Sequence, residues 1–452
     1  MMIKKILLSV FLVGVIGIVG LIIVMAIAGR DIPEPDVSDL MPERTEIAPD
    51  QNAYTYFIAA TNSLYWPTNK ILVVDYLDGK SADKSVIQDI ITRNDETLRL
   101  LDEGIARGAC ITPEVTGFDT MLPYLTPWRN MGRLLALKTR HARHSRNFKQ
   151  ATGTCISLLR FGNLIQRDAG CLINYLVGLS VLDLGLTQAQ DLARDEGLSG
   201  ADLKRLSEIL DALDPLARGL IKAIKVEYKV ADKTIEEFAQ GKYGLNELFY
   251  LGEGNPKPIL KGNHIPGYFF QPNRTKRAFA DFYRNVISNA SQPYGDMSCD
   301  MDIFAREMEA HLETSGATLL MRPNAVGKIL CALITPALRS VLERKCRTES
   351  GVNATRIIAA LNAHQKREGV MPADLQALVP EYLPSVPVDP FDGKPMRYSA
   401  ANGIVYSVGS DLMDSGGSTN LPAGETCSDP AKQRWEAEDA VFELHSPSVK
   451  SE

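Results

Sequence analysis

The sequence predicts a mainly α-helical protein with an N-terminal transmembrane helix, an α-helical bundle or short irregular α-hairpin array, and a small C-terminal α+β module containing a β-hairpin. Three observations predict this fold class. An uncharged run fills residues 6–28, and apolar residues recur at helical spacing from about residue 127 to 240. Near the C-terminus, Asn402-Gly403 separates two segments of alternating polarity.

The first of these segments is long enough to cross a membrane. No charged residue occurs from Ile6 to Ala28, and a helix of this length extends about 35 Å, against a hydrocarbon core of about 30 Å. A cleaved signal peptide is the competing interpretation, because residues 26–28 (Ala-Ile-Ala) match the small-residue cleavage pattern. A signal peptide normally has an apolar core of only about 7–15 residues, so the length favours an uncleaved anchor.

Charge predicts the orientation and disfavours one class of partner. Lys4 and Lys5 precede the span and acidic residues follow it within 31–39, so the positive-inside rule places residues 1–5 in the cytoplasm and the bulk of the chain in the periplasm. The composition, 45% hydrophobic and 23% charged, is typical of a folded globular body. The net charge of −6 gives no basic footprint for nucleic acid, so we expect no nucleic-acid partner.

A linker and a long helical domain follow the membrane segment. Residues 29–50 carry prolines among acidic residues, and we expect an unpacked tether. We expect residues 51–349 to form an extracytoplasmic α-helical domain with a loop-rich insert at 241–274. The insert contains turn-forming residues and clustered aromatics, which either line a binding surface or fold back onto the bundle.

Within the helical domain, local signals place the first elements. Asp50 is a candidate cap for a helix over 51–61, and Ser81 or Asp83 begins a helix that ends near residues 104–108. The intervening residues 70–75 (Lys-Ile-Leu-Val-Val-Asp) are either a short strand or a buried connection.

Helices of about 15–25 residues follow, joined by short turns, so neighbours are expected to pack antiparallel. Breaks are expected at Asn147, at Gly170, over 197–200 and at 214–215. Further helices are expected over 275–290, 300–314 and 325–348.

Seven cysteines are scattered along the chain without a Cys-x-x-Cys pair. An oxidising compartment permits bridges, most readily among Cys299, Cys331, Cys346 and Cys427, and an odd count leaves at least one free thiol. Cys155 and Cys171 lie in apolar helical patterns, which favours buried small hydrophobic residues.

The C-terminal module follows from its residues. An amphipathic helix starts at Asn353 or Thr355 and ends at Gly369, and Pro372 begins a second, short helix. A proline-punctuated crossing leads to the hairpin around Asn402-Gly403. The loop over 409–417 then supplies the carboxylates of Asp411 and Asp414 together with flexible backbone carbonyls.

This stretch, over about 353–417, resembles the C-terminal region of the major pseudopilins of type II secretion systems, which points to a bacterial protein. The resemblance implies a pseudopilin-like module over 350–417, followed by a polar tail over 418–452. It also implies calcium binding by Asp411 and Asp414, and a solvated Asp/Gly turn is the alternative. The chain departs from the family because no processing glycine precedes the apolar segment and about 320 residues separate that segment from the module.

Catalytic motifs do not emerge from the sequence: it has no nucleophile elbow, phosphate loop, His-Glu-x-x-His or dinucleotide glycine pattern. His141 and His144 are flanked by arginines, which favours a solvated basic face. Glu307 and His311 lie four residues apart and favour an exposed pair.

The expected function is therefore a non-enzymatic, membrane-anchored structural or protein-interaction component of the cell envelope, near a type II secretion or pilus-like system. Its expected partners are envelope proteins, and residues 6–28 contact the membrane. An extracytoplasmic hydrolase with a site assembled from distant residues, and a calcium-stabilised binding protein, are the alternatives.

Overall fold

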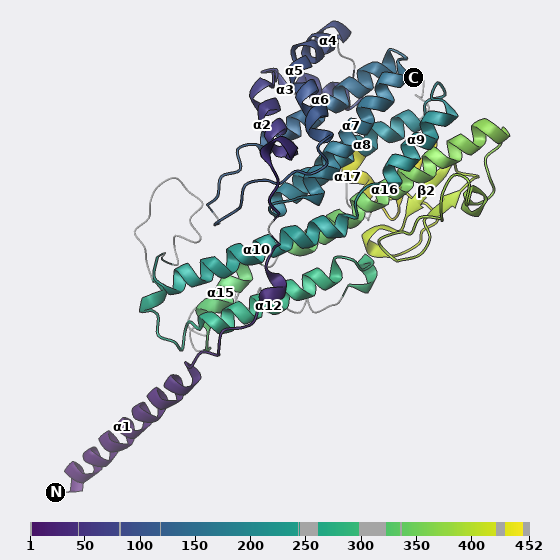
Figure 1. Ribbon diagram of the computed structural model, residues 1–452. Coiled ribbons are helices and arrows are strands. Elements are labelled where there is room, and N and C mark those ends of the chain that lie inside the picture. Colours follow the sequence, from purple (N-terminus) through teal and green to yellow (C-terminus); the bar gives the residue numbers. More distant parts are fainter. Residues whose placement is uncertain are drawn as a thin grey trace.

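The protein is mainly helical, with a small antiparallel sheet near the C-terminus and an apolar helix at the N-terminus (Figure 1). The computed structural model describes residues 2–43, 45–80, 83–117, 119–242, 244, 261–297, 322–334, 337–421 and 430–445. Half of the expected insert (243 and 245–260), the expected helix over 300–314, and Cys299, Glu307, His311 and Cys427 lie outside the described residues.

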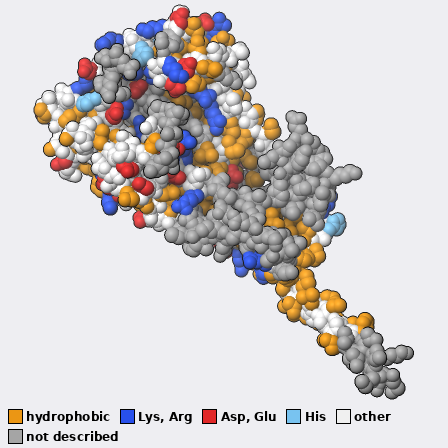
Figure 2. All heavy atoms as spheres, turned by 180° about the vertical axis from the view of Figure 1, so that it is seen from behind, with side chains coloured by type: hydrophobic (Ala, Val, Ile, Leu, Met, Phe, Trp, Pro, Cys, Tyr) orange, Lys and Arg blue, Asp and Glu red, His pale blue; other side chains and the backbone are white. Residues whose placement is uncertain are grey.

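Helix α1 (Met2–Ala28) extends away from the rest of the protein, and its residues from Phe11 onward expose large apolar side chains (Figures 1 and 2). Its length and composition suit a membrane anchor or a signal sequence. Helix α8 (Leu172–Ala193) is also long and apolar, but most of it is buried inside the protein, which is typical of a core helix.

The segment after α1 is packed against the body, so the expectation of an unpacked tether is wrong for residues 29–40. Asp31 accepts hydrogen bonds from the backbone N–H groups of Asn273 and Arg274, at 2.8 and 3.0 Å, at the start of helix α12 (Pro272–Asn289). Leu40, in the short 3-10 helix η1 (Ser38–Leu40), is 1% exposed and belongs to the main core. Specific polar contacts and one apolar anchor outweigh the extended character of a proline-rich sequence.

Four short helices form the first part of the body: α2 (Ala53–Ser63), α3 (Lys70–Leu77), α4 (Lys84–Arg93) and α5 (Asp95–Ile105). Asp83 caps α4 as expected. Asn52, rather than Asp50, caps α2, because the short 3-10 helix η2 (Pro49–Gln51) precedes it. Residues 70–75 are helical, with Val73 and Tyr76 buried one turn apart, so the strand alternative is wrong.

A single long helix over 83–104 is also wrong, because the chain breaks at Asn94. This side chain is fully buried, and its amide nitrogen donates to the carbonyl oxygens of Ile90 and Tyr65. Its amide oxygen accepts from the N–H of Tyr65. An asparagine that bonds the backbone in this way competes with the helical hydrogen-bond pattern and ends α4.

The centre of the body is built from α6 (Leu125–His144), α7 (Phe148–Arg167), α8, α9 (Gly200–Asp211) and α10 (Leu216–Ala239). Helix α7 packs against both of its neighbours in the chain, α6 and α8, as expected, but the expectation is wrong for α9, which packs mainly against α16 (Ala337–Glu368). The breaks fall where the sequence predicts them. Helices α7 and α8 approach closely through two glycines. A Cβ at Gly178 would lie 2.4 Å from the backbone nitrogen of Gln166, and one at Gly162 would lie 2.6 Å from that of Leu182. Only glycine permits this approach.

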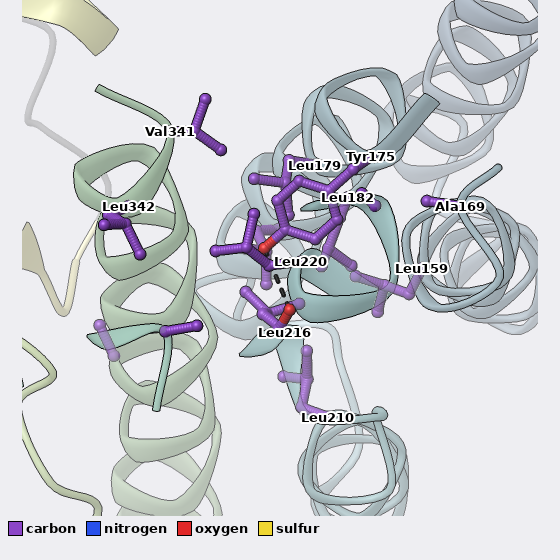
Figure 3. Close-up of a cluster of buried hydrophobic side chains, with 14 of the residues drawn as sticks. Leu159, Ala169, Tyr175, Leu179, Leu182, Leu210, Leu216, Leu220, Val341 and Leu342 are labelled. Atoms are coloured by element: carbon purple, nitrogen blue, oxygen red, sulfur yellow. Dashed lines mark hydrogen bonds between the residues drawn. The ribbon is translucent and has the colours of Figure 1, made fainter. Parts of the chain in front are cut away.

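Leucine side chains from α7, α8, α9, α10 and α16 (Ala337–Glu368) meet in the main core (Figure 3). The hydroxyl of the buried Tyr175 donates to the carbonyl oxygen of Leu216 at 3.1 Å (Figure 3). This bond satisfies the phenol and ties α8 to the first residue of α10.

Two helices replace the expected pair over 325–348 and 353–368. Helix α15 (Ala325–Ile334) is short, and α16 continues without a break past the expected module boundary at 349/350. Buried packing against α8 and α9 holds this continuation, because Ser350 and Ala354 are fully buried and Gly351 lies against Leu186. Gly369, with φ of +80°, ends α16 as expected.

The sheet has the order β1-β2-β3, from β1 (Arg397–Ser399), β2 (Ile404–Ser407) and β3 (Ala440–Glu443). The hairpin around Asn402-Gly403 is confirmed, with Tyr398 paired to Val405. β3 pairs antiparallel with β2, so the expectation of a polar tail over 418–452 is wrong for residues 440–443. Ala440 and Phe442 are 1% exposed, which explains why this segment packs.

The remaining described elements are short. They are the 3-10 helices η3 (Gly262–His264), η4 (Tyr294–Asp296), η5 (Leu375–Leu378) and η6 (Gly409–Asp411), and helix α17 (Pro430–Glu436). Asp374, rather than Pro372, precedes and caps η5. Val405 and Phe442 from the sheet share the main core with Ile358 of α16. The sheet therefore packs onto the helical body through α16.

Candidate functional site

The first residue of β1 organises the polar side chains of the C-terminal module. The Nη1 atom of Arg397 lies 3.0 Å from Asp389 Oδ2, and its Nη2 atom lies 2.5 Å from Asp392 Oδ2. Its Nε atom lies 3.2 Å from Asp414 Oδ2. One guanidinium thus contacts three carboxylates, which come from the crossing before β1 and the loop after β2. We call these four residues the Arg397 cluster.

Asp389 is the buried member of the Arg397 cluster. Its carboxylate also accepts hydrogen bonds from the N–H groups of Phe391 and Val408 and from the hydroxyl of Ser407. Burial raises the pKa of Asp389, and these three hydrogen bonds act in the opposite direction. Asp389 therefore connects the proline-punctuated crossing to the end of β2 and stabilises the module from within.

The two outer carboxylates of the cluster are held in the charged form. Burial acts to raise the pKa of Asp392 and of Asp414, but for each the hydrogen bonds and the positive charge of Arg397 outweigh it, so both pKa values are lowered. The N–H of Lys394 also bonds Asp392, and that of Gly416 bonds Asp414. These carboxylates are the natural partners of a fixed cation.

The two predicted calcium ligands have different hydrogen-bond partners. Asp414 is already in contact with Arg397, and its Oδ1 accepts from the hydroxyl of Tyr406 at 3.2 Å. Asp411 is exposed, and its Oδ1 accepts from the N–H of Met413. Among the described residues, no group of three or more His, Cys, Asp or Glu side chains is placed to hold a metal ion. Calcium takes about six to eight oxygen ligands, which backbone carbonyls and water can also supply, so calcium binding by Asp411 and Asp414 stays a prediction.

Protein hydrogen bonds hold the loop over 409–417. Asp439 is fully buried just before β3, and its Oδ2 accepts from the N–H groups of Ser415, Gly417 and Ser418 at 3.1, 2.8 and 3.2 Å. Ser407 is buried as well and is committed to Asp389. The sequence reasoning missed Asp439, because the segment that carries it was expected to be a polar tail.

The Arg397 cluster was missed for a different reason. Its signal was present in the sequence as Asp389-Pro-Phe-Asp392, five residues before an arginine that opens a strand. The carboxylates in the later loop suggested a metal ion as their partner, which drew attention away from Arg397, the residue that pairs with Asp414.

The basic face around His141 and His144 is less solvated than expected. The side chains of Arg140 and Arg143 are 13% and 15% exposed, and both pair with Asp191 of α8, at 3.6 and 3.3 Å. Burial lowers the pKa of both histidines, and nearby positive charges add to this effect. The arginines therefore join α6 to α8 and do not form an open cationic surface.

The five described cysteines, which are Cys110, Cys155, Cys171, Cys331 and Cys346, are free thiols and are buried. Burial raises the pKa of Cys155, of Cys331 and of Cys346 to about 12. The expectation that Cys155 and Cys171 pack as small hydrophobic residues is confirmed.

A scan against protein-family models, a search of curated proteins and a search of solved structures each found no match to this chain.

Proposed function

We propose that this chain is a membrane-anchored extracytoplasmic protein that serves as a structural or protein-interaction component of the bacterial cell envelope. The observation that carries the proposal is the combination of an exposed apolar helix α1 with a junction segment, residues 28–40, that is packed onto the body. Lysines precede the span and acidic residues follow it, which favours a cytoplasmic N-terminus.

The junction segment supports a role that depends on a defined position relative to the membrane. Gln271 donates to the carbonyl oxygen of Ala28 at 2.7 Å, directly at the end of α1. A few residues further on, the carboxylate of Asp39 bonds Arg284 of α12 through both oxygens, at 2.7 and 2.8 Å. A free tether would leave the position of the body relative to the membrane undefined. These contacts fix the body beside the end of α1, as a scaffold at the membrane surface requires.

The association with a type II secretion or pilus-like system rests on the resemblance of residues 353–417 to major pseudopilins. A helix that ends at Gly369, followed by the hairpin of β1 and β2, supports this part of the proposal. The Arg397 cluster gives the module a cation of its own, so the proposed interaction role does not require calcium.

The partner proposal is tested by crosslinking in membranes of the native host, purification of the full-length chain in non-ionic detergent, and mass spectrometry of the proteins that copurify. We expect components of a secretion or pilus-like machine. Deleting the module would cut α16 and expose core residues, so a surface variant is the better probe. Met413 is 66% exposed, and Met413→Lys should reduce recovery of partners that dock on the loop.

The control is Met121→Lys, since Met121 is 84% exposed and precedes α6, far along the chain from the C-terminal module. Recovery of machine components with wild type and with Met121→Lys, but not with Met413→Lys, supports docking through the module. If repeated purifications of the wild-type chain recover no envelope protein, the proposed interaction role is overturned.

A further inference from the structure

A cleft of about 370 Å³ lies where α8, α16 and the C-terminal segment meet. Its lining residues are Asp183, Leu186, Thr187, Gln190, Arg344, Arg347, Gly351, Lys432, Arg434, Trp435 and Phe442. The volume suits a small organic molecule. Neither the Arg397 cluster nor the junction segment takes part in it.

The charge of the lining is strongly one-sided. Arg344 and Arg347 come from one face of α16, three residues apart, while Lys432 and Arg434 come from α17. Asp183 of α8 is the acidic residue among the lining side chains that the structure describes. Among the described residues of the lining, four cations face one carboxylate, and this excess of positive charge favours an anion.

Three of these cations have carboxylate partners. Arg344 pairs with Asp183, Arg347 pairs with Glu343 at 2.5 Å, and Lys432 pairs with Glu436 at 3.3 Å. Glu343 and Glu436 are not among the described residues of the lining.

Arg434 differs from the other three. Within the described part of the chain no carboxylate lies in ion-pair contact with it, and its guanidinium stacks over the ring of Phe442 at 4.5 Å. Burial and the positive charge of Arg194 lower the pKa of Arg434 to about 10, while the negative charge of Glu443 acts in the opposite direction. A positive charge held in a cleft next to another cation is stabilised when an anion binds beside it.

Aromatic and aliphatic groups complete the cleft. The guanidinium of Arg347 lies 5.8 Å from the ring centre of Trp435, so cation and ring are presented together. Leu186 and Phe442 add apolar surface. The two polar side chains of α8 are already engaged, since Gln190 donates to Thr355 and Thr187 donates to the carbonyl oxygen of Asp183. Binding specificity is therefore left to the guanidinium groups and the rings.

We propose that this cleft binds a small phosphate monoester, with the phosphate against Arg434 and Arg347 and the organic part against Trp435. Arginine suits this ligand because its planar fork donates two parallel hydrogen bonds to a phosphate group. A doubly charged phosphate group is attracted more strongly by the excess positive charge than a singly charged carboxylate is. The inference is independent of the proposed envelope role.

A membrane phospholipid could in principle supply the same phosphate chemistry. In Figure 1, α1 leaves the body beside α12 and α15, whereas α17 lies behind α8 and α16, away from the point where α1 joins the body. This separation favours a soluble ligand. Vesicles of phosphatidylcholine with added phosphatidic acid distinguish the two sources, and we expect them not to compete with a soluble phosphate.

The test is isothermal titration calorimetry of the full-length chain in non-ionic detergent with phenyl phosphate and with inorganic phosphate. We expect both to bind, and phenyl phosphate to bind more tightly because of Trp435. Arg434→Gln should weaken phenyl phosphate binding at least about tenfold, as expected for the loss of a charge-assisted hydrogen bond. The matched control is Arg99→Gln, in an exposed ion-pair network on α5, which should leave binding unchanged.

Lys432→Gln provides a second variant, because this side chain is 67% exposed and its loss does not threaten folding. It should weaken binding by a smaller factor. Absence of binding by the wild type at millimolar ligand, equal binding by Arg434→Gln and wild type, or equal loss in Arg99→Gln would each overturn the proposal. Competition by the phosphatidic acid vesicles would overturn the assignment to a soluble ligand.

Discussion

Replacing Arg397 by methionine removes the positive charge that three carboxylates share. Asp389 is fully buried and lies 3.0 Å from the guanidinium, while Asp392 is 11% exposed and lies 2.5 Å from it. Removing one partner of a buried ion pair costs about 3–5 kcal/mol, because the other charge stays buried. Asp389 keeps three other hydrogen-bond donors and Asp414 is 48% exposed. We therefore expect a loss of about 3 kcal/mol, at the low end of that range.

Hydrogen–deuterium exchange of a peptide covering β2 measures this loss locally in the full-length chain. A change of about 3 kcal/mol corresponds to exchange that is about 100-fold faster. Arg367→Met is the control, since its side chain is 56% exposed and pairs with Glu368 and Glu381 at the surface. Exchange in β2 should be unaffected by that substitution.

The dependence on pH gives the variant a second signature. In the wild type, the pKa values of Asp392 and Asp414 lie below 3.8, so their stabilising effect is complete above that pH and is lost as the pH falls below it. The pKa of Asp389 is raised, so its effect on stability has the opposite pH dependence. Its stabilising contribution is present below pH 3.8 and is lost as the pH rises above 3.8.

In Arg397→Met the three carboxylates lose their cation and take up protons at higher pH than in the wild type. Acidification from neutral pH toward pH values of about 4–5 should therefore narrow the difference in β2 exchange between variant and wild type. Equal exchange at neutral pH, or a difference that grows on acidification, would refute this description of the cluster.

Three further predictions concern the body and the junction segment. Gly178→Ala should destabilise the protein by about 3 kcal/mol through overpacking at the α7–α8 contact, while Gly153→Ala, with open space around it, should stabilise α7 by about 1 kcal/mol. Thermal unfolding followed by circular dichroism measures both changes. Equal effects of the two substitutions on stability would contradict the close approach of α7 and α8. Asp31→Ala removes the cap of α12 and should lower the free energy of unfolding by about 1 kcal/mol, which speeds hydrogen–deuterium exchange at the start of α12. Unchanged exchange would mean that the junction segment is not docked on α12. Cys155 should resist iodoacetamide at neutral pH until denaturant is added, because burial raises its pKa to about 12. Peptide mass spectrometry detects the modification. Rapid labelling of Cys155 in the native protein would contradict its burial.

The sequence was most informative where local chemistry decides structure. Gly369 and Asn402-Gly403 end a helix and turn a hairpin because of backbone conformations that glycine tolerates, and both positions agree with the structure. The long helices of the central body follow from apolar periodicity over many turns. These features need no knowledge of distant contacts.

Expectations were wrong where tertiary contacts decide. Asn94 breaks a helix through bonds to Tyr65, and Asp31 docks a proline-rich segment onto a helix more than two hundred residues away. Asp439 and Phe442 turn an apparently polar tail into part of the sheet. The Arg397 cluster likewise joins a crossing, a strand and a loop; the nearby Asp389 and Asp392 are a local signal, but the contact with Asp414 depends on the tertiary fold.

The central proposal is that α1 stays in the mature protein and holds the body outside the cytoplasm. The most direct measurement is mass spectrometry of the full-length chain from washed membranes of its host, combined with protease treatment of spheroplasts. We expect a peptide from residues 6–28 in the membrane fraction and digestion of the body by protease added from outside. A mature N-terminus just after Ala28, or a body protected in intact spheroplasts, would contradict the proposal.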